Sequence, residues 1–242
     1  MNLIIDAGNT FVKMAVFDNG NMLHIKSKKV SQLVKTVENI LVDFPKIQQA
    51  IISSVVVLEE HTLQELLKLV SIQILGANTN LPFDNTYATP ETLGVDRMAL
   101  AAAACALFPK RNCLVIDAGT CVTYDLINSK GIYLGGAISP GINMRYKALN
   151  NQTSKLPLLE IEEPESLIGN TTASSIHSGV VNGVCAEIDG VIDQYLTRYE
   201  DLTVILTGGD SLFLSKRLKN TIFAHSNFLL EGLNYLLDYN KR

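Results

Sequence analysis

Short apolar runs and amphipathic stretches alternate along the whole chain, which is the pattern of strands and helices in an α/β protein. The first run, residues 3–5, predicts a buried strand that ends in a turn of small residues. Residues 11–17 predict the next strand, with a turn at 18–20. Residues 31–44 carry apolar side chains at helical spacing, and Ser31 is the expected N-cap of that helix. The remaining predicted strands cover residues 50–53, 72–75, 114–116 and 202–206, and the remaining predicted helices cover residues 59–70, 95–107, 172–198 and a short segment that ends near 149.

The beginning of the chain is repeated in its second half, at an offset of 111 residues. Asp6-Ala7-Gly8 falls on Asp117-Ala118-Gly119, the apolar strand residues before them match, and the turn glycine Gly20 falls on Gly131. A strand, a DAG turn, a second strand and a later turn that recur at about half the chain length indicate two copies of one domain. The predicted domains are residues 1–112 and 113–242.

Composition narrows the class of protein. The 242 residues are 47% hydrophobic and 18% charged, which excludes a disordered chain, and the net charge of −4 argues against a dedicated nucleic-acid binder. The longest apolar run, residues 98–108, is shorter than the roughly 20 residues that span a bilayer, and the N-terminus has no signal-peptide pattern, so we expect no membrane partner. The four cysteines include no CxxC pair and are expected to be reduced core residues. A cytoplasmic enzyme or binding protein is the expected class.

The two DAG turns are the strongest candidates for chemistry. GxGxxG, GxxxxGK[ST] and HExxH are all absent, so these familiar phosphate and metal motifs do not apply. Each DAG turn places an acid at the end of a strand and follows it with small residues whose backbone N–H groups can approach an anion closely. The acid repels phosphate but can hold a cation that binds it, and two facing copies would clamp a polyphosphate and its metal. The alternative is a pair of ordinary β-turns, in which Asp, Gly and Asn are common.

A further candidate is the segment Gly94-Val95-Asp96-Arg97, at the start of a predicted helix. In the functional interpretation, Asp96 is a carboxylate base and Arg97 is a guanidinium that holds a substrate carboxylate. In the structural interpretation, Asp96 complements the helix dipole and Arg97 makes a surface ion pair. Residues 207–210 are a weaker candidate, in which paired glycines after a strand would let a flat ring or a sugar lie against the backbone. The four histidines share no spacing and are expected to be structural or exposed.

Taken together, these residues resemble the type III pantothenate kinases, a family of the actin and sugar-kinase superfamily. The DAG turns point to the superfamily, whereas the GVDR segment at 94–97 and the GGAISPG segment at 135–141 are specific to the family. The resemblance covers nearly the whole chain and is carried by residues 6–13, Tyr87, Pro90, 94–97, 117–120, 135–141, 169–172, 207–209 and 230–233.

The resemblance implies ATP-dependent phosphorylation of pantothenate to 4′-phosphopantothenate, the first step of coenzyme A biosynthesis. It implies two ribonuclease H-like (actin-like) domains, each a mixed sheet flanked by helices, in a homodimer. It also implies a monovalent cation (K⁺ or NH₄⁺) and Mg²⁺ that is bound with ATP. The implied site residues are Asp96 as the catalytic proton acceptor, Asp117 as the metal ligand, Asp6, Ala7, Gly8, Asn9, Thr10, Phe11, Val12, Lys13 and Thr120 for ATP, and Tyr87, Gly94, Val95, Asp96, Arg97 and Thr172 for pantothenate.

Two other classes of function stay open on the same fold. One is a non-catalytic nucleotide-binding regulatory protein, which Asp96 and Arg97 disfavour because a regulator has no need for a base. The other is a different small-molecule kinase, or a polyphosphate hydrolase. ADP release measured with and without pantothenate separates all three.

Overall fold

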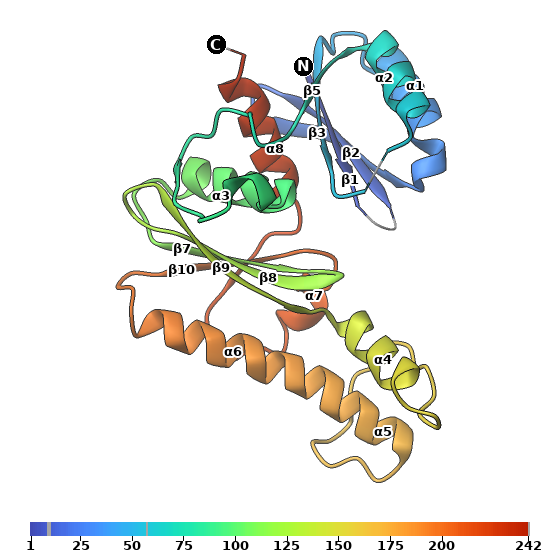
Figure 1. The fold of residues 1–242 in the computed structure, drawn as a ribbon, viewed down its shortest axis with the longest axis vertical. Helices are drawn as coiled ribbons and strands as arrows, with labels where there is room; N and C mark the ends of the chain where they lie inside the picture. Colours follow the sequence, from blue (N-terminus) through green and yellow to red (C-terminus); the bar gives the residue numbers. More distant parts are fainter. Residues whose placement is uncertain (9–10, 57, 242) are drawn as a thin grey trace. The chain divides into compact units, whose positions relative to one another are not determined.

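The structure is a computed structural model that describes residues 1–8, 11–56 and 58–241 (Figure 1). The chain forms two compact units: the first comprises Met1–Pro109, Gly131–Tyr133 and Phe228–Arg242, and the second Lys110–Lys130 and Leu134–Asn227. Each unit is built on a mixed sheet flanked by helices, which confirms the predicted α/β class. The domain division at residues 112 and 113 stays a prediction. No helix of the described residues is long and apolar enough to cross a membrane.

Among its described residues, the first unit contains a five-stranded sheet and four α-helices, together with a short strand, β6. Their bounds are β1 (Asn2–Ala7), β2 (Val12–Asp18), β3 (Asn21–Lys28), β4 (Gln49–Ser54), β5 (Ser71–Ile74), β6 (Asp84–Asn85), α1 (Leu33–Asp43), α2 (Glu60–Leu69), α3 (Val95–Leu107) and α8 (Phe228–Tyr239). The strand order is β3-β2-β1-β4-β5, with β2 antiparallel to β1 and β3, and with β4 parallel to β1 and β5.

The side chains of β1 alternate between the two faces of this sheet, as the period of two along a strand requires. Leu3, Ile5 and Ala7 belong to one core cluster together with Val37 of α1 and Leu66 of α2. The residues between them face the other side, where α8 packs on β1 and lies beside α3 (Figure 1). Asp6, the next-to-last residue of β1, therefore belongs to the face that α3 and α8 cover.

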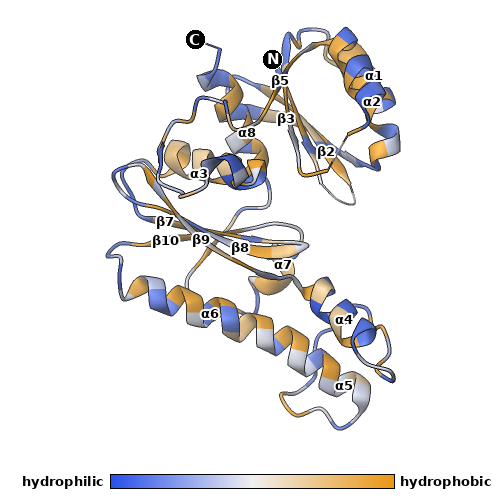
Figure 2. Ribbon diagram, viewed as in Figure 1, coloured by the Kyte–Doolittle hydropathy of each residue, from blue (hydrophilic) through white to orange (hydrophobic). Residues whose placement is uncertain are grey.

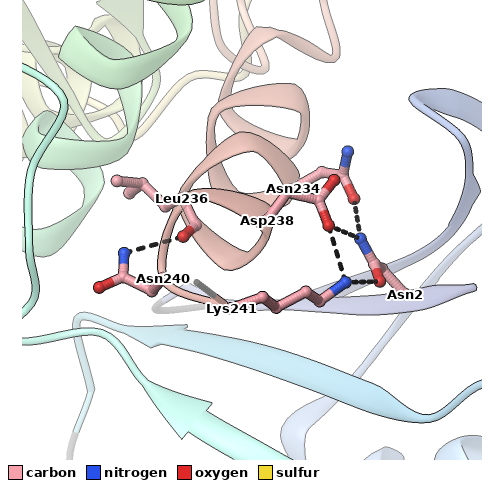
Figure 3. A network of polar contacts seen from close by, with 6 residues as sticks. All are labelled: Asn2, Asn234, Leu236, Asp238, Asn240 and Lys241. Atoms are coloured by element: carbon pink, nitrogen blue, oxygen red, sulfur yellow. Dashed lines mark hydrogen bonds and ion pairs between the residues drawn. The ribbon is translucent and has the colours of Figure 1, made fainter.

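A polar network joins the first strand of the chain to its last helix (Figure 3). The buried Asn2 side chain donates to Asn234 Oδ1 at 2.7 Å and to Asp238 Oδ1 at 3.0 Å. Lys241 Nζ donates to Asn2 Oδ1 and to Asp238 Oδ1. Residues more than 230 positions apart in the sequence thus satisfy one another's polar groups, and this network fixes α8 to the first unit.

The second unit contains the repeated half. Its elements are β7 (Cys113–Ala118), β8 (Cys121–Ile127), β9 (Ile132–Pro140), β10 (Thr203–Thr207), β11 (Phe223–Ala224), α4 (Ile142–Asn151), α5 (Thr172–His177), α6 (Gly183–Leu196) and α7 (Ser211–Leu214). The strand order is β11-β10-β7-β8-β9, and β6 adds to Ile132 and Tyr133, the residues of β9 that belong to the first unit. α6 lies along one face of this sheet (Figure 1). Its hydrophobic positions alternate with hydrophilic ones along its length (Figure 2).

The two sheets share one topology. Counted along the chain from each DAG strand, both have the order 3-2-1-4-5, with the first strand antiparallel to the second and parallel to the fourth. The turn glycines that align in the repeat, Gly20 and Gly131, have φ of 82° and 75°, a backbone region that side chains disfavour. The duplication inferred from the sequence is therefore present in the backbone.

Two local predictions were wrong. α1 begins at Leu33, after a 3₁₀ turn at Val30–Gln32, so Ser31 lies inside that turn and Gln32 occupies the N-cap position. The helix predicted over 172–198 is divided by a π-helical turn at Ser178–Asn182, and it ends at Leu196.

Candidate functional site

The first DAG turn closes β1 onto β2. Gly8 N donates to Phe11 O at 3.1 Å, and Ala7 O accepts from Val55 N at 3.1 Å, so the backbone around the turn is hydrogen-bonded. Asn9 and Thr10, two of the predicted ATP-binding residues, lie outside the described residues. Phe11 is half-exposed, Val12 is buried in the core, and Lys13 is paired in register with Asp6.

The Asp6 carboxyl is the electrostatic centre of this turn. Burial raises the pKa of Asp6 from 3.8 to about 6, the charge of Lys13 opposes that rise in pKa, and the charge of Asp96 adds to it. Asp96 stands in the first turn of α3, so the first unit brings both a lysine and the predicted base within electrostatic range of the DAG acid Asp6. A raised pKa at a polar strand end is typical of a site that receives a cation or a proton.

The start of α3 holds Asp96 in a compact turn. Asp96 Oδ1 accepts from Arg97 N at 2.8 Å, and its carboxylate folds back over Gly94, where an added Cβ would lie 2.5 Å from Oδ1. A residue with a side chain at position 94 would therefore displace the carboxylate. The helix-dipole interpretation describes this position correctly, and it is compatible with a role as a base.

Arg97 is buried, with 5% of its surface exposed, so it is not the surface residue that the structural interpretation assumed. Its guanidinium carbon lies 5.7 Å from the centroid of the Tyr87 ring, in cation–π contact. The Tyr87 ring in turn contacts the buried Tyr133 ring, with 6.2 Å between centroids. The structure thus brings two predicted pantothenate residues, Tyr87 and Arg97, into contact beside Asp96.

The second DAG turn is enclosed by backbone. Asp117 points away from the core side of β7, because the residues on either side of it, Ile116 and Ala118, belong to the core cluster with α6. Gly141 N donates to Thr120 O at 3.1 Å, and a Cβ at Gly141 would collide with Gly119 O.

The opposite side of this turn is packed as closely. Gly208 has φ of 94°, and a Cβ there would collide with Asp117 Oδ1 and with Ala118 O. Asp210 N donates to Ala118 O at 2.9 Å. The GGAISPG segment at 135–141 and the TGGD segment at 207–210 therefore both pack through a glycine against the turn at 117–120.

The oxygen atoms at this turn suit a hard cation. Asp117 offers a carboxylate and Gly119 a backbone carbonyl, which are the donors that such ions prefer. Within the described ranges, no group of three or more Asp, Glu, His or Cys side chains is placed to hold a metal ion. A cation at Asp117 would therefore complete its shell with backbone oxygens, water or phosphate.

The profile of the type III pantothenate kinase family matches residues 2–194. The chain belongs to the type III pantothenate kinase family. Curated relatives of that name include a protein of Flavobacterium johnsoniae, which is 50% identical over 99% of this chain and 98% of its own length. Another, from Christiangramia forsetii, is 51% identical over 100% of this chain and 99% of its own length.

Solved structures of other proteins, a sugar kinase among them, share this fold. A Campylobacter jejuni protein described as a Baf family transcriptional activator is similar with a TM-score of 0.64 and 22% identity, over 99% of this chain and 98% of that one. A glucokinase from an Antarctic psychrotroph has a TM-score of 0.55 and 13% identity, over 98% of both chains. At such identities these likenesses show the fold alone.

The remaining family residue, Thr172, lies in the second unit at the start of α5. It lines an open groove of about 1180 Å³ together with Gly169, Asn170 and Thr171. The Thr171 hydroxyl accepts from Ser174 N and caps the helix, so it is already engaged. Thr172 is exposed and lines the groove, and its role in binding pantothenate stays a prediction.

Sequence reasoning missed some residues around the two turns. Ser53 pairs in register with Asp6 across β1 and β4, is fully buried, and has no hydrogen-bond partner for its hydroxyl among the described residues. The sequence feature that could have identified Ser53 is a hydroxyl at the end of a strand that runs parallel to the DAG strand. Arg145 and Glu187 form an ion pair beside the GGAISPG segment, but they lie 42 positions apart, and no local pattern links them.

Proposed function

We propose that this chain phosphorylates pantothenate with ATP to give 4′-phosphopantothenate, as its family does, and that Asp96 is the proton acceptor of the reaction. The observation that carries the proposal is the group at the start of α3. There Asp96 precedes the buried Arg97, which contacts the Tyr87 ring, and the charge of Asp96 acts on Asp6.

The roles follow from the chemistry of phosphoryl transfer, which depends on positioning and charge neutralisation more than on covalent catalysis. Asp96 accepts the proton of the pantothenate hydroxyl as that oxygen attacks the γ-phosphate. Arg97 pairs with the pantothenate carboxylate, and the Tyr87 ring holds the guanidinium plane from one side. Gly94 leaves room for the Asp96 carboxylate at the helix start, Val95 lies between them and is assigned to the same substrate site, and Thr172 supplies a hydroxyl.

ATP is assigned to residues 6–13 and Thr120. The Gly8 and Gly119 N–H groups already donate to Phe11 O and Cys121 O, so the Lys13 ammonium and the Thr120 hydroxyl are the groups assigned to attract phosphate. Mg²⁺ bound with ATP, and K⁺ or NH₄⁺ held by Asp117, neutralise phosphate charge when they are present. The protein's own contribution is to fix the oxygen atoms of Asp117 and Gly119, which the close glycines make rigid.

The test of the activity is ADP release by the purified chain with ATP and Mg²⁺, with and without pantothenate. We expect release that depends on pantothenate and yields 4′-phosphopantothenate by mass spectrometry. ADP release without pantothenate would indicate a hydrolase, release with another small alcohol alone would indicate a different kinase, and nucleotide binding without turnover would indicate the regulatory class.

Three finer assignments belong to the same proposal. Rates in KCl and NH₄Cl should exceed the rate in NaCl at matched ionic strength, and Asp117→Asn should abolish the difference. Light scattering should give the mass of a homodimer. A cytoplasmic location stays a prediction from the family, to be checked by fractionation of cells.

A further inference from the structure

The ion pair between Arg145 and Glu187 lies beside the second DAG turn and has no role in the mechanism above. We propose that these two residues are positioning residues, which hold the segment at 139–141 against the turn at 117–120 and thereby set the affinity for nucleotide. The inference rests on the proposed function only in taking the turn at 117–120 as part of the ATP site.

Arg145 is placed to fix the end of β9. It lies one helical turn after Gly141, and its own N–H donates to Gly141 O at 3.1 Å. Its side chain turns back along the chain, so that Nε donates to Pro140 O at 2.9 Å and Nη2 donates to Ser139 Oγ at 3.0 Å. The side chain of Arg145 therefore holds Ser139 and Pro140, and its backbone N–H holds Gly141, the N-cap of the helix.

Glu187 anchors the guanidinium from α6. Arg145 Nη2 donates to Glu187 Oε2 at 2.5 Å, and Tyr124 of β8 donates from its hydroxyl to Glu187 Oε1 at 3.2 Å. Burial alone would raise the pKa of Glu187, but hydrogen bonds from Arg145 and Ser139 and the charge of Arg145 bring it below its ordinary value. Glu187 is thus a carboxylate at neutral pH, and its anchor Tyr124 is buried in the core.

The segment that this pair holds is in direct contact with the turn. Gly141 has no room for a Cβ against Gly119 O, and it donates its N–H to Thr120 O. Pro140 has a restricted φ, so the segment moves as a short rigid piece. A shift of Ser139 and Pro140 therefore displaces Gly141 and, with it, the carbonyls of the turn, because close-packed backbone transmits displacement.

The chemistry of the pair suits orientation more than stability. The side chains are 21% and 30% exposed, and ion pairs that water reaches contribute little to the free energy of unfolding. The planar guanidinium reaches Pro140 O, Ser139 Oγ and Glu187 Oε2 at once, a fork that a lysine ammonium cannot reproduce. Replacement should therefore change ligand affinity more than it changes the melting temperature.

The experiment compares Arg145→Gln with Lys147→Gln, which removes an equal charge from an exposed position of the same helix. We expect Arg145→Gln to weaken ADP binding, measured by calorimetry, by about 5- to 30-fold. Hydrogen exchange in residues 117–122 should become faster, while exchange in β1 stays the same. The Michaelis constant for pantothenate should remain within about twofold of wild type.

Glu187→Gln should give the same changes, and the double variant should add little to either, since both act through one contact. If Arg145→Gln does not fold, Arg145→Lys keeps the charge and loses the fork, and it should still weaken ADP binding. An unchanged ADP affinity with unchanged exchange in 117–122 would overturn the inference. So would a selective rise in the pantothenate constant, because Arg145 also lines the groove that contains Thr172. Wild-type turnover with pantothenate is measured separately, so a failure of the proposed function is recognised independently.

Discussion

The two DAG turns occupy the same place in two sheets of the same strand order, yet their surroundings differ. The first turn carries titratable neighbours, because Lys13 and Asp96 both act on the partly buried Asp6 carboxyl. The second turn is enclosed by backbone, with Gly141 on one side and Gly208 on the other. The same motif therefore has two uses. In the first unit it lies beside the candidate catalytic residue, and in the second it is a turn that close glycine packing makes rigid. Substitutions in each turn can separate these two uses.

The largest expected effect is on turnover, from Asp96→Asn in the first unit. The amide keeps the shape of the carboxylate and cannot accept a proton, so turnover should fall about 10²–10⁴-fold. ADP binding should persist, as calorimetry would show. Turnover within a factor of two of wild type would remove Asp96 from the mechanism and would leave the first turn without assigned chemistry.

The next effect concerns packing at the second turn. Gly208→Ala introduces a Cβ that meets Asp117 Oδ1 and Ala118 O at a positive φ, so we expect a loss of about 2–4 kcal/mol in the free energy of unfolding. Nucleotide binding should weaken as well. Gly209→Ala is the matched control, because no atom lies within 4 Å of a Cβ at that position. Equal denaturation midpoints for the two variants would contradict the enclosure of the second turn.

The third prediction concerns substrate anchoring by Arg97. Arg97→Lys keeps the charge but loses the fork for a carboxylate and weakens the contact with Tyr87. The Michaelis constant for pantothenate should rise about 10- to 150-fold, and that for ATP should change far less. A lower melting temperature with an unchanged pantothenate constant would assign Arg97 to structure alone.

The smallest effect is on stability and depends on pH. Because the pKa of Asp6 is about 6 when folded and 3.8 for an ordinary carboxyl, the folded chain binds the extra proton, and stability falls as the pH rises from about 4 to 6. Asp6→Asn lacks this loss, so above pH 6 it should be more stable than wild type by about 1–3 kcal/mol. Thermal melts at pH 4 and pH 7.5 test this, and an equal difference at both pH values would refute it.

Local patterns in the sequence predicted much of the architecture. The spacing of apolar residues, together with the turn residues, closely predicted β1, β4, α1, α2 and α3. A buried strand and an amphipathic helix each have a characteristic spacing of apolar residues along the sequence. The repeat of Asp6-Ala7-Gly8 at Asp117-Ala118-Gly119 predicted the duplication. β3 was missed because its polar residues, which suit a largely exposed edge strand, mask the alternation. Ser31 failed as a cap because a 3₁₀ turn delays the start of α1.

The chemistry of the candidate site depended on contacts between distant segments. The sequence identified Asp6, Asp96 and Arg97 as candidates, and the family resemblance gave them roles. The proximity of Asp96 to Asp6, however, follows from the packing of α3 on the sheet of the first unit. Asp6 has a raised pKa because folding buries it, and burial is a property of the assembled chain. The Arg145–Glu187 pair and the close approach of Gly141 and Gly208 to the second turn are likewise invisible in local spacing, since each joins residues brought together by the path of the backbone.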